Sequence, residues 1–149
     1  MDQTIRQSLL SYIRKEFFAL RNGMIADTLR KGGLEQKYIF GLQLPQIKEI
    51  SVKFKQSEDD DTCLLAQELW NDRECREARL LACHLMPPSK LNANEAIEWA
   101  EDVSTREEAD ILAFRLLRYL PYASSIADTL ASSDSDLKTY TATAIRRFL

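Results

Sequence analysis

The chain has 149 residues, of which 45% are hydrophobic and 29% charged, and its net charge is −3. That length suits one domain, residues 1–149, whose core needs neither disulfides nor a metal ion for folding. Only four glycines and four prolines occur, which excludes collagen-like and low-complexity proteins and favours long helices with short connections. The missing basic surplus is a weak argument against a dedicated nucleic-acid binder.

The cysteine and histidine content excludes several kinds of site. Cys63, Cys75 and Cys83 form no C-x-x-C pair, so zinc ribbons and thioredoxin-type sites have no support. We expect reduced thiols in a cytoplasmic protein, without a cofactor. His84 is the only histidine, which rules out a site with two histidine ligands, and no metal is expected. No apolar run approaches the roughly 20 residues of a membrane span, so we expect no membrane contact.

Apolar spacing and turn residues predict four helices in the first half of the chain, over about 5–17, 24–29, 46–54 and 63–70. Gly32-Gly33 ends the second of them, and Pro45 opens the third. The acidic run 58–61 precedes the fourth helix, where it interacts favourably with the helix dipole. A hydrophobic connection, residues 38–41, lies between the second and third helices.

The second half contains three segments that resemble helix N-caps with an acid three residues later. They start at Asn71, Asn92 and Ser104. Proline ends the helices before 87–88 and before 121, and a last helix covers roughly 136–149. No stretch has the composition of a linker, which is consistent with a single domain.

A repeat of 31 residues relates two of these helices. Residues 77–82 (EARLLA) align with 108–113 (EADILA), and a third, degenerate copy follows after the same offset. Helical units of about thirty residues are typical of α-solenoids, in which each helix pair buries its apolar face against the next. The repeat therefore predicts an all-α fold, a curved, right-handed stack of antiparallel helix pairs.

Four stretches carry a resemblance to a known family. They are Glu16–Asn22, Tyr38–Pro45, Glu68-Leu69-Trp70 with Arg76-Glu77, and Ser104–Asp110. In this order and spacing they resemble the DNA alkylation-repair glycosylases, which are built from HEAT-like helical repeats. The resemblance implies a curved α-solenoid of HEAT-like antiparallel helix pairs, and this chain corresponds to roughly the N-terminal two-thirds of such a protein.

The resemblance also implies a chemistry. Family members excise positively charged N3- and N7-alkylated purines, using a carboxylate near the sugar, aromatic walls and an arginine for phosphate. Asp110 occupies the carboxylate position here. The family's tryptophan, four residues earlier, is replaced by Arg106. Its later tryptophan–arginine pair is replaced by Leu137 and Tyr140 or, with the alignment shifted by one residue, by Lys138 and Thr141.

The candidate residues each have a plainer interpretation. Arg106 lies one helical turn from Asp110, so the two can form an ion pair that keeps the carboxylate charged, or merely a surface salt bridge. Arg73, Arg76 and Arg79 recur every three residues and suggest a basic stripe for nucleic-acid binding, alongside Arg106 and Tyr140. Later basic residues add positive charge to this stripe: Arg115, Arg118, Lys138, Arg146 and Arg147. Dispersed, solvated charge is the alternative for the stripe.

The two tryptophans and the histidine are expected in the core. Trp70 and Trp99 end apolar helices and should pack between repeats, although base stacking is the other possible role. His84 stands beside Leu81 and Leu85, and we expect its ring to be satisfied between helices.

Three functions remain open from the sequence. The first is a catalytically weakened relative of the repair glycosylases that binds double-stranded DNA weakly and without sequence specificity. The second is an active alkylpurine DNA glycosylase using Asp110. The third is a protein–protein interaction solenoid without DNA binding. Apolar residues left on the last helix, such as Phe148 and Leu149, also suggest a homodimer.

Overall fold

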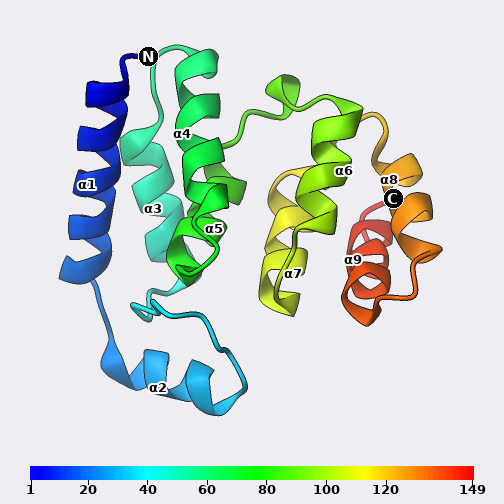
Figure 1. The fold of residues 1–149 in the computed structure, drawn as a ribbon, viewed down its shortest axis with the longest axis horizontal. Coiled ribbons are helices and arrows are strands. Elements are labelled where there is room, and N and C mark those ends of the chain that lie inside the picture. Colours follow the sequence, from blue (N-terminus) through cyan, green and yellow to red (C-terminus); the bar gives the residue numbers. More distant parts are fainter. The chain divides into compact units, whose positions relative to one another are not determined.

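The computed structural model describes all of residues 1–149 and contains helices, loops and one isolated β-bridge (Figure 1). The nine α-helices are α1 (Gln3–Ala19), α2 (Gly23–Lys31), α3 (Leu44–Phe54), α4 (Asp59–Asn71), α5 (Arg76–Leu85), α6 (Ala93–Glu101), α7 (Arg106–Arg115), α8 (Ala123–Ala131) and α9 (Asp136–Arg146). Two 3₁₀ turns, η1 (Pro88–Lys90) and η2 (Leu117–Tyr119), complete the secondary structure. The all-α prediction is confirmed, and none of the helices has both the length and the apolar character that a bilayer span requires.

The chain divides into two compact units. Unit 1 is Met1–Leu85 and holds α1 to α5, and unit 2 is Met86–Leu149 and holds α6 to α9. Each unit is described by itself below. The curved solenoid and the single domain stay predictions of the sequence.

Of the three predicted helix N-caps, one is confirmed, one is shifted by a residue and one is wrong. Asn92 caps α6 with both halves of a capping box in place, as predicted. The cap of α7 is Thr105 rather than Ser104, because the Thr105 side chain accepts the Glu108 amide hydrogen. The prediction at Asn71 is wrong, since that residue is the last of α4 and α5 begins only at Arg76. The intervening chain turns instead and pairs Cys75 with Tyr38 in the β-bridge.

Unit 1 is organised around the packing of α5 against α3 and α4. The first amphipathic helix is confirmed as α1, and it buries Ile13 and Phe17 completely. Its other apolar positions behave differently, because the side chains of Ile5 and Tyr12 are more than half exposed. α1 therefore contributes a narrow apolar stripe at its centre rather than a full face.

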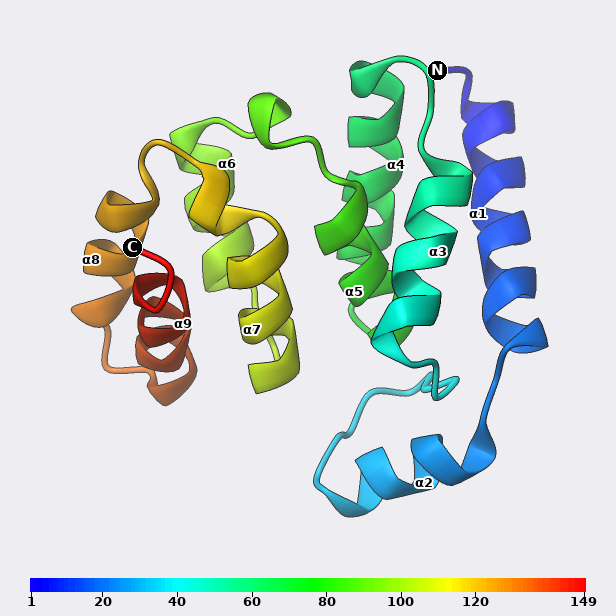
Figure 2. The ribbon, with the colours of Figure 1, turned by 180° about the vertical axis from the view of Figure 1, so that it is seen from behind.

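Unit 2 places α9 against both α7 and α8, which the second view shows (Figure 2). Small side chains line these helices where they meet, and Ala109, Ala113 and Ala144 are fully buried. The alanine side chain occupies little volume at a contact, so helices that carry alanine there can approach closely. This packing brings the exposed edges of α7 and α9 together, and those edges carry Asp110 and Tyr140.

Candidate nucleic-acid interface around Asp110

Asp110 on α7 is hydrogen-bonded to Tyr140 on α9. The Tyr140 hydroxyl lies 2.9 Å from Oδ1 and 3.0 Å from Oδ2 of the carboxylate, so it donates to either oxygen. Both residues were candidates from the sequence, and the structure brings them into direct contact. The Asp110 side chain is 43% exposed, so a ligand in solution can reach it.

Two arginines flank this pair in different ways. The Arg106 guanidinium lies 4.8 Å from the centre of the Tyr140 ring, a cation–π distance. Arg106 makes no ion pair with Asp110, contrary to the sequence prediction, because it packs over the ring while the hydroxyl takes the carboxylate. Arg147 is the cation that approaches Asp110, with 3.8 Å between Nη1 and Oδ1.

The surroundings of Tyr140 favour its neutral form. The hydrogen bond to Asp110 raises the pKa of the phenol above its ordinary value, and burial and the Asp110 charge act in the same direction, while Arg147 opposes them. A raised phenol pKa means that Tyr140 stays neutral and remains a donor at physiological pH. The carboxylate therefore accepts a hydrogen bond from a neutral phenol on the side that faces α9.

The three arginines of the predicted stripe belong to unit 1, whereas Asp110 and Tyr140 belong to unit 2. Arg73 is exposed in the turn after α4. Arg79 is fully buried: its guanidinium lies 3.5 Å from the Trp70 ring centre and donates to the Trp70 carbonyl oxygen. Arg76 is 5% exposed. The expectation that all three face solvent in one stripe is not met.

Arg76 and its neighbour Glu77 hold a loop. Nη1 of Arg76 donates to the Leu42 carbonyl oxygen at 2.9 Å and to Glu77 Oε2 at 2.7 Å. Glu77 also accepts the amide hydrogens of Phe40 and Gly41 at 2.9 and 3.1 Å. A buried ion pair is tolerated when further hydrogen bonds satisfy it, as they do here. Hydrogen bonds to Glu77 thus hold the hydrophobic connection 38–41 against α5.

The tryptophans and the histidine occupy interior or half-buried positions. Trp70 and Trp99 are 2% and 7% exposed, so the expectation of core packing is confirmed for both. His84 is half-buried, and its Nδ1 lies 2.9 Å from the Leu80 carbonyl oxygen one turn earlier. None of the three presents a ring to solvent as a stacking platform.

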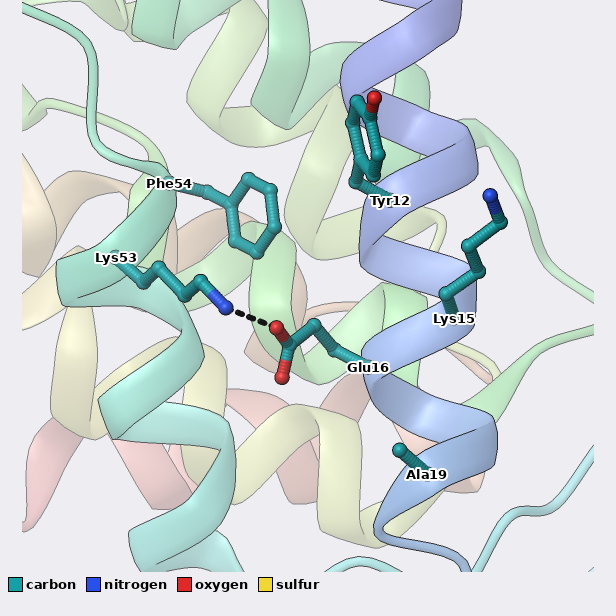
Figure 3. Close-up of a pocket in the computed structure, with 6 residues that line it drawn as sticks. All are labelled: Tyr12, Lys15, Glu16, Ala19, Lys53 and Phe54. Atoms are coloured by element: carbon teal, nitrogen blue, oxygen red, sulfur yellow. Dashed lines mark hydrogen bonds and ion pairs between the residues drawn. The ribbon is translucent and has the colours of Figure 1, made fainter.

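A shallow hollow of about 380 Å³ lies between α1 and α3 of unit 1 (Figure 3). Tyr12 and Phe54 form its aromatic side, and an ion pair between Lys53 and Glu16 joins the two helices across it. The hollow contains none of the candidate catalytic or nucleic-acid-binding residues from the sequence. Its ion pair has an obvious role in holding α3 to α1, so the site around Asp110 remains the better candidate.

These features define an all-helical protein with a polar site on the exposed edges of two packed helices. Residues 13–145 match the family of DNA alkylation repair enzymes, and the chain belongs to that family. The family resemblance drawn from the sequence motifs is confirmed to this extent. No curated protein and no solved structure matches the chain.

The sequence placed Arg147 among the basic residues of the stripe but not beside Asp110, where the structure has it. It follows Tyr140 by seven residues, two helical turns, which places both side chains on the same face of α9. That spacing was a usable signal. The sequence alone did not indicate that α9 would lie beside Asp110, so the spacing could not be linked to that site.

Proposed function

We propose that this protein binds DNA in alkylation repair and excises alkylated purines slowly, with Asp110 as the carboxylate. The observation that supports the slow chemistry is the pair of hydrogen-bond distances between Tyr140 and Asp110, 2.9 and 3.0 Å. Family membership supports the repair role.

The physical reason lies in the charge of the carboxylate. Loss of a cationic base leaves an oxocarbenium-like sugar, which a nearby carboxylate stabilises in proportion to its free negative charge. A phenol donor and the nearby guanidinium of Arg147 offset part of the Asp110 charge and restrict its approach to a sugar. Removing one preorganised electrostatic group costs about 100- to 1,000-fold in rate, and weakening it costs less.

Arginines at the same edges support DNA binding. Arg106 makes no ion pair and Arg147 makes only a long one, so both retain charge for phosphates. The overall net charge of −3 opposes a strong complex. Binding should therefore be weak and non-specific, with a steep salt dependence of about −0.9 in log–log slope per phosphate neutralised.

The test is incubation with methylated duplex DNA and measurement of released 3-methyladenine and 7-methylguanine. We expect slow release that Asp110→Asn abolishes, together with DNA affinity that the variant keeps. Release that is independent of Asp110 would overturn the assignment of the carboxylate. Absence of DNA binding even at low salt would favour the protein-interaction alternative.

A fully active alkylpurine glycosylase is the second candidate, and the position of Arg147 favours it. The family's phosphate-binding arginine is replaced at its own position by Tyr140, but Arg147 supplies a guanidinium within 3.8 Å of Asp110. Fast release that depends on both Asp110 and Arg147 would establish this alternative. Slow release that Arg147→Gln leaves unchanged would contradict it.

A further inference from the structure

A second group of aromatic and basic side chains lies at the C-terminal ends of α7 and α9 and in η2, beyond Asp110. The rings of Phe114 on α7 and Phe148 just after α9 meet with centroids 5.6 Å apart and planes tilted by 53°. Their side chains are 38% and 39% exposed. Exposed apolar side chains that contact one another are candidates for an interaction site.

Two arginines lie over these rings, and neither forms an ion pair with a carboxylate. The Arg118 guanidinium lies 4.4 Å from the Phe114 ring centre and 5.2 Å from that of Phe148. Arg115 lies 5.2 Å from the Phe114 ring centre. Nε of Arg118 is buried and has no hydrogen-bond partner. The cluster thus combines open aromatic rings with positive charge that no acid neutralises.

The cluster is continuous with the site around Asp110. Phe114 follows Asp110 by four residues on α7, so both lie on one face of that helix. Phe148 follows Arg147, the residue that approaches Asp110. A strand of nucleic acid that reached Asp110 would therefore have the aromatic pair within its path.

We propose that Phe114 and Phe148 form a stacking subsite for an unpaired DNA base, with Arg118 on the adjacent phosphate. The proposal rests on the DNA-binding role argued above. Base stacking on aromatic rings joined to arginine–phosphate contacts is how proteins bind unpaired nucleotides. An apolar peptide would fit the rings but would leave the arginines without an anion, so charge complementarity selects the nucleic acid.

The experiment compares two duplexes by fluorescence anisotropy at low salt, one fully paired and one with a single bulged 2-aminopurine. We expect the bulged duplex to bind roughly tenfold more tightly, which is the effect of about one stacked base. The 2-aminopurine emission should fall on binding, since stacking quenches it. Phe114→Leu and Phe148→Leu keep an apolar side chain and should abolish the preference and the quenching, whereas Arg118→Gln should weaken both duplexes.

The matched control is Phe18→Leu in unit 1, where Arg21 packs 3.9 Å from the ring centre in a similar cation–aromatic pair. This substitution should leave the affinity for both duplexes and the 2-aminopurine quenching unchanged. Equal affinity for both duplexes, or equal loss in the control, would overturn the proposal. A bulge preference that survives in a protein without any base release would leave the stacking subsite standing and remove the proposed catalytic role of Asp110.

Discussion

At the scale of single residues, the proposed site centres on the hydrogen bond from Tyr140 to Asp110. Asp110 came from the family motif, where its position is that of the carboxylate. By the sequence resemblance, Tyr140 stands where the motif has an arginine; in the structure its neutral hydroxyl donates to the Asp110 carboxylate. The raised pKa of Tyr140 keeps this donor protonated.

Replacing Tyr140 by phenylalanine tests that interpretation. Tyr140→Phe removes the donor but keeps the ring under Arg106, so Asp110 recovers free charge. We expect base release from methylated DNA to rise by about 3- to 10-fold, the equivalent of one hydrogen bond. Stability should change little, because the pair is half exposed. Tyr12→Phe, an exposed tyrosine of unit 1, serves as control. A fall in base release would show that Tyr140 positions Asp110 for catalysis.

Individual residues also show which parts of the site could be predicted from the sequence and which could not. Asp110 and Tyr140 were found because motif spacing survives in a single chain. Arg76 and Arg79 were misplaced because arginine is rarely buried, and spacing alone suggested a solvated row. Their burial depends on the Trp70 ring and on the loop 38–42, which lie far from them in sequence or on another helix. Such contacts require the tertiary structure.

At the scale of elements, the helices were predictable and their connections were not. Periodic apolar residues located α1 to α4, and the 31-residue offset related the buried glutamates Glu77 and Glu108. Both glutamates accept backbone hydrogen bonds from loops: Glu77 from Phe40 and Gly41 in the loop before α3, and Glu108 from Ser104 just before its own helix. The repeat therefore preserves a device that fastens a loop to a helix. Nothing in the sequence pattern disclosed that device.

The loop held by Glu77 makes a sharp prediction at Gly41. Its φ of +85° and the nearby Asn22 carbonyl oxygen leave no space for a Cβ atom. Gly41→Ala should lower the free energy of unfolding by about 3 kcal/mol, from backbone strain and displacement of the loop. Gly33→Ala shares a positive φ but meets nothing within 4 Å, so about 1 kcal/mol is expected there. Urea unfolding measures both. Equal costs would mean that the contact with Asn22 contributes nothing.

At the scale of the whole molecule, net charge conceals local charge. The sum of −3 describes an acidic protein, whereas three arginines lie at or next to the exposed edges of α7 and α9: Arg106, Arg118 and Arg147. Opposite charges elsewhere on the surface do not cancel this field at contact distance, because salt screens interactions beyond about 8–10 Å. A weak DNA-binding surface is therefore compatible with the overall composition.

The division into two compact units makes it testable whether residues 1–149 unfold as one domain. Unit 2, residues 86–149, is close in size to the ~60-residue domains that bury only about 60% of their chain surface and are marginal alone. We therefore expect both units to unfold together. Each unit holds one buried tryptophan, Trp70 in unit 1 and Trp99 in unit 2, so Trp99→Phe and Trp70→Phe each leave a probe in one unit.

In urea, the fluorescence transition of each variant should coincide with its own circular dichroism transition, which is the test of a two-state process. Comparison within a variant removes the effect of the substitution itself on stability. A fluorescence midpoint that differs from the circular dichroism midpoint in either variant would show that the units unfold separately. The single-domain prediction would then be wrong, and the site around Asp110 would belong to an independently folding unit 2, since all its residues lie there.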